Sequence, residues 1–171
     1  ADPQRRILAA TVNDVRIVNL YVVNGAEVGT DKYIYKLEWL KAVTQWLHTQ
    51  IRQYPKLVVL GDFNIAPDER DVHAPALWCG KIFCSEPERN ALKAMETVGL
   101  SDTFRLFAQA DKSFSWWDYR AGNFRRNHGL RIDLILASKP LVDICKACYI
   151  DREPRTWDKP SDHAPVVTEF Q

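Results

Sequence analysis

The chain lacks long apolar runs and a strong net charge. No apolar stretch in its 171 residues approaches the roughly 20 residues that a helix needs to cross a bilayer, so no membrane partner is expected. The net charge is only +1 at pH 7, so bulk charge does not by itself indicate nucleic acid binding. Residues 1–6 lack the apolar segment and cleavage site of a signal peptide, which favours a cytoplasmic protein.

The chain is also poor in cysteine, and it shows no internal repeat, low-complexity tract or linker. Among its four cysteines, Cys145 and Cys148 have the spacing of a zinc or redox motif. A zinc site would also need Cys79 and Cys84 to converge on them, so reduced thiols in an intracellular protein are favoured. Apolar residues make up 46% of the chain, which indicates one globular domain able to bury a core.

The most informative stretch is a short apolar run that ends in polar side chains. Residues 57–60 are all apolar, which is typical of a strand buried on both faces. Asp62 and Asn64 follow, and strand alternation would place them on the same side. Pro67 excludes a continued central strand. Ligands of α/β sheets bind at such carboxyl ends, although an Asx turn that only caps a core strand is the alternative.

Periodicity predicts an α/β protein. We expect helices over residues 32–53 and 88–98, the first with its N-cap at Thr30 or Asp31. We expect strands over 7–12, 15–23, 56–61, 114–119, 130–137, 144–150 and 166–170. Residues 65–87 form a long irregular connection, and connections of that length are usually functional or disordered.

Two further acids and a histidine are candidates for chemistry. Asp133 lies inside an apolar strand, where a carboxylate needs a partner, and a structural salt bridge is one explanation. Asp162 and His163 are adjacent in the chain, so their side chains diverge and Asp162 is a poor partner for the imidazole. A distant acid such as Asp133 could instead orient His163 and stabilise its charged form.

An aromatic segment and a basic segment overlap. Residues 114–120 contain two tryptophans, one phenylalanine and one tyrosine, and such strips are more often packing than binding surfaces. Residues 112–132 carry five basic side chains against one acidic side chain, a local net charge of +4. The basic neighbourhood favours stacking on a nucleic acid over simple packing.

These motifs together resemble the exonuclease III family, the bacterial abasic-site branch of the endonuclease/exonuclease/phosphatase superfamily. The resemblance is carried in order by residues 19–25, 61–67, 114–120, 129–133 and 160–165, and it spans nearly the whole chain. The motifs at 61–64 and 161–163 are shared with deoxyribonuclease I and with lipid phosphatases. The stretch from Ser115 to Arg120 is more specific to the abasic-site branch.

The resemblance implies a fold and a missing portion. Family members form a four-layer α/β/β/α sandwich, and this chain corresponds to its carboxyl-terminal half. An amino-terminal segment in family members supplies an Asn and a Glu that bind the metal. We therefore expect residues 1–171 to form a single domain that is incomplete at its amino terminus and has that segment as a partner.

The resemblance also implies an activity. The expected enzyme is a magnesium-dependent DNA phosphodiesterase of DNA repair, with manganese as a possible substitute. It would cleave duplex DNA on the 5′ side of abasic sites and remove nucleotides from 3′ ends. The alternatives are a phosphomonoesterase or lipid phosphatase of the same superfamily, and a non-catalytic DNA-binding fragment.

Roles for single residues follow from the same resemblance. Asp62 would activate the attacking water, with Asn64 hydrogen-bonding the phosphate and steadying Asp62. His163, held by Asp133, would stabilise charge on a phosphate oxygen, and Tyr21 would assist the leaving group. The residues expected at the metal are Asp62, Asn64, Asp162 and His163. The residues expected to contact DNA are Asn24, Trp116, Arg120, Asn127, Leu130 and Ile132.

Overall fold

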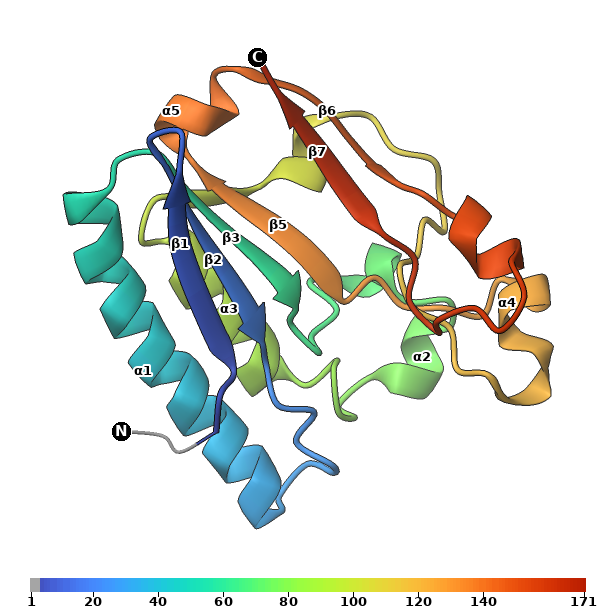
Figure 1. The fold of residues 1–171 in the computed structure, drawn as a ribbon. Coiled ribbons are helices and arrows are strands. Elements are labelled where there is room, and N and C mark those ends of the chain that lie inside the picture. The colour runs from blue at the N-terminus through green and yellow to red at the C-terminus, as the bar shows by residue number, and fades with distance from the viewer. Residues whose placement is uncertain (1–3) are drawn as a thin grey trace.

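The computed structural model describes residues 4–171 and contains two β-sheets (Figure 1). The expectation about a signal peptide in residues 1–6 therefore lies partly outside the described residues. The larger sheet has the strand order β1-β2-β3-β5-β4. Its strands are β1 (Ile7–Val12), β2 (Val15–Tyr21), β3 (Leu57–Asp62), β5 (Asp133–Ser138) and β4 (Leu100–Asp102). The smaller sheet pairs β6 (Cys145–Ile150) with β7 (Val166–Phe170).

One parallel pair lies at the centre of the larger sheet. β2 and β3 run parallel, and α1 (Asp31–Gln53) connects them, while the other neighbouring strands pair antiparallel. β1 and β2 form a hairpin around Asn13 and Asp14, whose φ angles of 46° and 68° suit the tight turns of hairpins. Of the two N-caps that the sequence left open, Thr30 caps α1 by accepting a hydrogen bond from the Tyr33 N–H, and Asp31 is the first helical residue. The helix ends just before Pro55.

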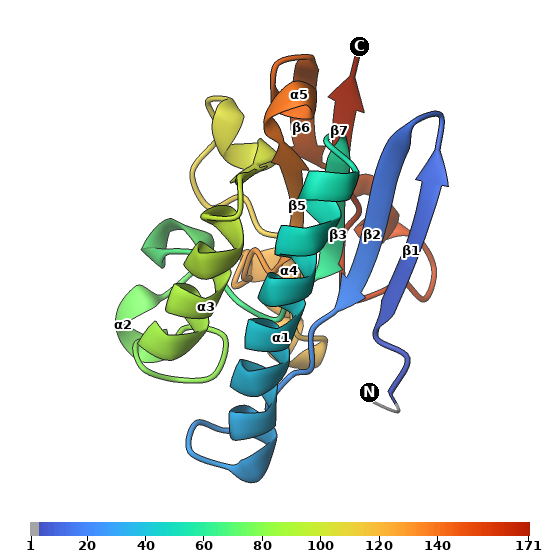
Figure 2. The same ribbon diagram turned by 90° about the vertical axis from the view of Figure 1, so that its left-hand side faces the viewer.

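The two long helices cover one face of the larger sheet. Figure 2 shows α1 and α3 (Glu86–Glu96) together on that side, where their apolar side chains form the main core with β2, β3 and β5. The small β6–β7 sheet packs on the opposite face, where Phe170 and Ile144 contact Val58 and Ala137. The layers are thus α/β/β, which matches three layers of the expected sandwich. No helix in residues 4–171 combines the length and apolar character of a bilayer span.

The remainder of that opposite face is open. Cross-strand register places Leu8 of β1 beside Asn19, and Asn19 beside Leu60, so these side chains share a face. Leu8 is 71% exposed and Val12 is 51% exposed. Apolar side chains of a sheet face are normally covered, so Leu8 and Val12 leave an exposed apolar surface on this face of the sheet.

Most sequence-predicted elements are present, with shifted ends. β1 and β7 have the expected bounds, and α3 begins and ends two residues before the expected 88–98. The strand expected over 114–119 is wrong, because only Trp116 makes isolated bridges there, to Leu130 and His163. Short elements that the sequence did not predict are α2 (Pro75–Trp78), α4 (Asn123–Arg126), α5 (Lys139–Val142), β4 and the 3₁₀ turns Glu69–Asp71, Arg120–Gly122 and Glu153–Thr156.

Candidate active site

Three polar residues on adjacent strands form a row on the open face of the larger sheet. Tyr21 of β2 is the register partner of Asp62 of β3, and Asp62 is the partner of Asp133 of β5. Side chains of such partners point to the same face and lie about 5 Å apart at Cβ. The alternation along β3 places Asp62 on the face of Leu60, opposite α1. Three residues from distant segments are thereby brought together by the register alone.

Asp62 and Asn64 meet through a tight turn. The Asn64 N–H donates to Asp62 Oδ1 at 2.9 Å, and Asn64 Nδ2 donates to Asp62 Oδ2 at 3.0 Å. The same amide nitrogen also donates to the Val22 carbonyl at 2.9 Å. Asn64 has φ of +50°, a left-handed conformation that asparagine tolerates better than most residues. The two side chains therefore converge through an Asx turn rather than by strand alternation, because β3 ends at Asp62.

The carboxyl group of Asp62 is held in an unusual protonation range. Burial, followed by the negative charge of Asp133, raises the pKa of Asp62 to about 6. The Asn64 N–H, His163 and Lys36 act in the opposite direction and only partly offset this rise. A carboxylate with a pKa near neutrality is a stronger base than an ordinary aspartate and is still ionised at pH 7.

His163 is oriented by Asp133. Its Nδ1 lies 2.9 Å and 3.0 Å from the two carboxylate oxygens of Asp133, so Nδ1 carries the donated proton and Nε2 is left for another partner. Burial lowers the pKa of His163, but the hydrogen bond and charge of Asp133 outweigh it and raise the pKa. Ser115 Oγ accepts the N–H groups of Ile132 and Asp133, each at 3.1 Å, and so fixes the start of β5. The distant acid is thus the partner of the imidazole.

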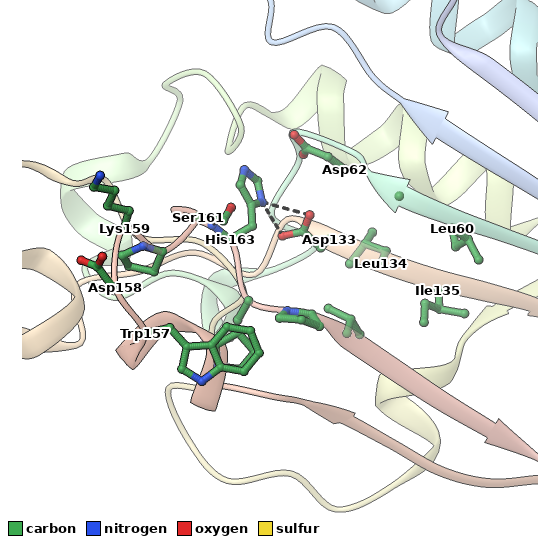
Figure 3. A pocket seen from close by; sticks show the side chains of 16 residues that line it. Leu60, Asp62, Asp133, Leu134, Ile135, Trp157, Asp158, Lys159, Ser161 and His163 are labelled. Carbon is green, nitrogen blue, oxygen red and sulfur yellow. Dashed lines mark hydrogen bonds and ion pairs between the residues drawn. The ribbon is translucent and has the colours of Figure 1, made fainter.

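A cavity of about 560 Å³ opens beside this pair. Figure 3 shows Asp62, Asp133 and His163 directed toward one another at one end of it. Leu60 and Ile135 form an apolar wall, and Trp157 lies on the far side with 61% of its surface exposed. Sequence reasoning missed Trp157, although an aromatic residue in the polar loop before His163 was a usable signal.

Trp116 joins the aromatic segment to the acidic residues. Its indole Nε1 donates to Asp162 Oδ2 at 2.9 Å, and its backbone exchanges hydrogen bonds with Leu130. Leu130 and Ile132 are 0% and 2% exposed, so they form the core beneath Trp116 rather than an open surface. Phe83, which sequence reasoning also missed, lies 6.2 Å from Trp116 between ring centroids.

The remaining candidates for DNA contact lie farther out. Arg120 has a side chain that is 88% exposed and is paired with Asp118. Asn24 is exposed, and its Oδ1 accepts the Ala26 N–H.

Two other polar residues in this region are fully engaged. Asn127 accepts from Trp117 Nε1 at 3.1 Å and donates to the Lys112 carbonyl at 3.0 Å, so both ends of its amide hold the loop. Arg131 is 1% exposed and ion-paired with Asp71 and Asp102. The local charge of +4 counted from the sequence therefore overstates the charge available at the surface, because that of Arg131 is neutralised inside the protein.

The side chains around Asp62 include suitable types of metal ligand, but too few of them. Asp62, Asp162 and the carbonyl oxygen of the Asn64 side chain are hard oxygen donors of the kind that Mg²⁺ prefers. His163 uses Nδ1 for Asp133. Within residues 4–171, no group of three or more His, Cys, Asp or Glu side chains is arranged to hold a metal ion. The expected ligands do not form a complete site in the described part of the chain.

Comparison with known proteins identifies the class first. A profile of the Endonuclease/Exonuclease/phosphatase family matches residues 2–163, and the chain belongs to that family. Its motifs and its relatives place it in the branch of DNA repair nucleases, which are hydrolytic enzymes, and the family is generally dependent on divalent metals.

Particular relatives narrow the class. The chain is 32% identical to "Exodeoxyribonuclease III" of Haemophilus influenzae, with 99% of this chain and 68% of the relative covered. It is 42% identical to the 3′ phosphatase NExo from Neisseria, solved bound to a product DNA hairpin, with a TM-score of 0.97 and 99% and 66% of the two chains covered. An AP endonuclease from Archaeoglobus fulgidus is 34% identical, with a TM-score of 0.93 and coverage of 100% and 68%. The chain spans about two thirds of the length of each relative.

Proposed function

We propose that this chain carries the catalytic acids and the imidazole of a metal-dependent DNA phosphodiesterase of DNA repair. Its substrates are duplex DNA with abasic sites and the 3′ ends of duplex DNA. The observation that carries the proposal is the pairing of Asp62 with Asn64 and of Asp133 with His163 at one end of one cavity. The relatives named above support the choice of DNA over other phosphodiesters.

Asp62 is the general base in this proposal. A pKa of about 6 leaves most of the carboxyl groups ionised at pH 7 while making each a better proton acceptor than a free aspartate. Asn64 steadies the carboxylate through two donated hydrogen bonds. Both hydrogens of its amide nitrogen are taken, by Asp62 and by Val22, so we assign Asn64 to positioning rather than to contact with the phosphate.

His163 and Tyr21 act on the phosphate. With Nδ1–H bound to Asp133, the Nε2 side of a protonated His163 can donate to a non-bridging oxygen and stabilise developing negative charge. The raised pKa of His163, which Asp133 causes, favours that protonated form. Tyr21 lies beside Asp62 in the sheet and is 50% exposed, so its hydroxyl is available to the leaving group.

We propose Mg²⁺ as the metal, with Mn²⁺ as a substitute. A bound divalent cation supplies positive charge that neutralises the phosphate during attack. Asp62, Asn64 and Asp162 offer oxygen ligands, and the remaining ligands come from another segment of the gene product. That segment also covers the open sheet face around Leu8, so that residues 4–171 form part of one larger domain. We place the protein in the cytoplasm.

A second activity has a specific observation behind it. The Neisseria relative is described as a 3′ phosphatase, and it shares 42% of its aligned residues with this chain. Removal of a 3′-phosphate needs the same water-activating base and the same charge stabilisation as cleavage of a phosphodiester. We propose it as an additional reaction of the same site.

One gel assay tests these proposals. The complete gene product that contains this chain is incubated with duplexes carrying an abasic site, a recessed 3′ end or a 3′-phosphate, with Mg²⁺ or with EDTA. We expect metal-dependent conversion of the abasic and recessed duplexes and its loss in Asp62→Asn. DNA binding without conversion of any duplex in Mg²⁺ or Mn²⁺ means that the protein is a DNA-binding module.

A further inference from the structure

A buried lysine lies where the ends of two strands and the start of one helix converge. Lys36 of α1 is 0% exposed. Its Nζ donates to the Asn64 carbonyl at 2.8 Å and to the Asn24 carbonyl at 3.1 Å, and it forms an ion pair with Glu88. These acceptors lie 28, 12 and 52 residues from Lys36 in the chain. A single ammonium group therefore ties together the end of β2, the end of β3 and the start of α3.

Glu88 has several other partners. It is 0% exposed, and its carboxylate accepts the N–H groups of Phe83 and Ser85, each at 3.1 Å, and the Ser85 hydroxyl at 2.6 Å. Charged groups are costly to bury unless they are paired and hydrogen-bonded, and Glu88 satisfies both conditions. The pair with Glu88 uses one of the three N–H donors of the Lys36 ammonium group, and the two backbone carbonyls accept the other two. The ammonium group thereby fixes the position of both carbonyls.

Both carbonyls belong to segments that carry site residues. Asn64 turns its carbonyl inward because its φ is +50°, and the same turn aims its side-chain amide at Asp62. The Val22 carbonyl, two residues before Asn24, receives the other hydrogen of that amide. Lys36 therefore holds the backbone carbonyl of Asn64, while the Asn64 side chain holds the carboxylate of Asp62.

The ammonium group also lies close to the aromatic pair of Phe83 and Trp116. Lys36 Nζ lies 5.5 Å from the centroid of the Phe83 ring, within the range of a cation–π contact. Phe83 in turn contacts Trp116 edge to face.

We propose that Lys36 is a positioning residue of the active site, which sets the orientation of the Asp62 carboxylate by fixing the Asn64 turn. The inference rests on the proposed function. Loss of the ammonium group leaves the buried Asn64 carbonyl without its donor, so the turn relaxes and Asp62 loses its fixed orientation. Small displacements of a catalytic group can reduce turnover by about 10²-fold without loss of substrate binding.

Charge-matched variants separate this role from simple stabilisation. Lys36→Met alone leaves the Glu88 charge unpaired in the interior, so it is expected to destabilise the fold. Lys36→Met combined with Glu88→Gln removes both charges and keeps one acceptor oxygen, which can serve Ser85, while the Phe83 N–H loses its acceptor. Lys36→Gln with Glu88→Gln is a second neutral pair that retains one donor. Lys41→Met is the matched control, since Lys41 is an exposed lysine on the same helix.

The variants are made in the complete gene product and compared by melting temperature, by kcat and KM on abasic duplex, and by hydrogen exchange of the Asn64 side-chain amide. We expect the double variants to melt near the wild type, to keep KM, to lose kcat by about 10²-fold, and to exchange the Asn64 amide faster. Lys41→Met should change none of these quantities.

Each outcome has a distinct meaning. A double variant with wild-type melting, kcat and amide exchange overturns the proposal and leaves Lys36 only as the counter-charge of Glu88. If neither double variant folds, Lys36 is required for folding itself and the positioning role is also overturned. Absence of cleavage by the wild type refutes the proposed function instead, and the exchange of the Asn64 amide then still decides whether Lys36 fixes the turn.

Discussion

Replacing Asp62 by asparagine should make the metal-free protein more stable above pH 7 while abolishing its activity. The reason is that the folded protein raises the pKa of Asp62, from an ordinary value of 3.8 to about 6, chiefly by burial and secondly through Asp133. A carboxyl with a raised pKa favours the folded state while it is protonated. Folding stability is therefore lost as pH rises through the interval between the two pKa values.

The magnitude can be worked out from those two values. One pKa step corresponds to about 1.4 kcal/mol, so the rise from 3.8 to about 6 corresponds to about 3 kcal/mol between acid and neutral pH. Asparagine does not ionise, so this loss is absent in the variant. In the variant, the amide nitrogen of the new asparagine replaces one carboxylate oxygen and faces a donor of Asn64, so one hydrogen bond is lost. That loss costs about 1 kcal/mol. The net gain near pH 8 is about 2 kcal/mol.

Urea unfolding in EDTA, at pH 4 and at pH 8, measures the effect. We expect the stability difference between Asp62→Asn and wild type to rise by about 2.4 kcal/mol from pH 4 to pH 8, because the unfolded carboxyl is already partly ionised at pH 4. Asp118→Asn is the control for sign, because the hydrogen bond from Arg120 lowers the pKa of Asp118 and its effect should run in the opposite direction. A stability difference for Asp62→Asn that does not change between the two pH values would refute the raised pKa of Asp62.

Other predictions follow from the same geometry. Asp133→Ala and His163→Ala should each reduce kcat, and the double variant should lose little more, because the residues act as one pair; additive losses in kcat would show that they work separately. Trp116→Phe should keep an aromatic ring at this position but weaken Tb³⁺ or Mn²⁺ binding, because it removes the hydrogen bond to Asp162. Unchanged metal affinity would show that this hydrogen bond does not support the metal site. The 171-residue chain alone should self-associate in sedimentation, and Leu8→Lys should reduce this, since Leu8 is 71% exposed on an open apolar face; a monomer at all concentrations would contradict the exposure.

The sequence predicted where Asp62 and Asn64 lie in the fold because the signals for them are local. The apolar run before Gly61 marks β3, and the polar residues after it mark the edge of the sheet. The Asp133–His163 pair was also predicted, although 30 residues separate its members. An acid in an apolar strand needs a partner, and the imidazole of His163 needs one other than the adjacent Asp162, whose side chain diverges from it. The expected strand over 114–119 failed because its backbone groups pair singly with two different segments instead of along one strand.

The supporting residues were not predictable in the same way. Lys36 occupies a buried position on α1, and a charge on the apolar side of a helix was a signal. Its acceptors, however, come from two loops and from α3, and no periodicity brings these segments together. Ser115 and Phe83 are ordinary residues whose roles depend on tertiary contacts with β5 and Trp116. Side-chain partners of this kind are set by packing, on which local sequence patterns carry little information.

In the proposed mechanism, a water molecule activated by Asp62 attacks the DNA backbone at this site. The most direct measurement is cleavage of a duplex with one abasic site by the complete gene product in ¹⁸O-labelled water with Mg²⁺. We predict a 3′-hydroxyl on one product and one ¹⁸O atom in the 5′-phosphate of the other, with no reaction in EDTA or in Asp62→Asn. An unsaturated sugar at the 3′ end without ¹⁸O in the phosphate, or equal cleavage by Asp62→Asn, would contradict the account.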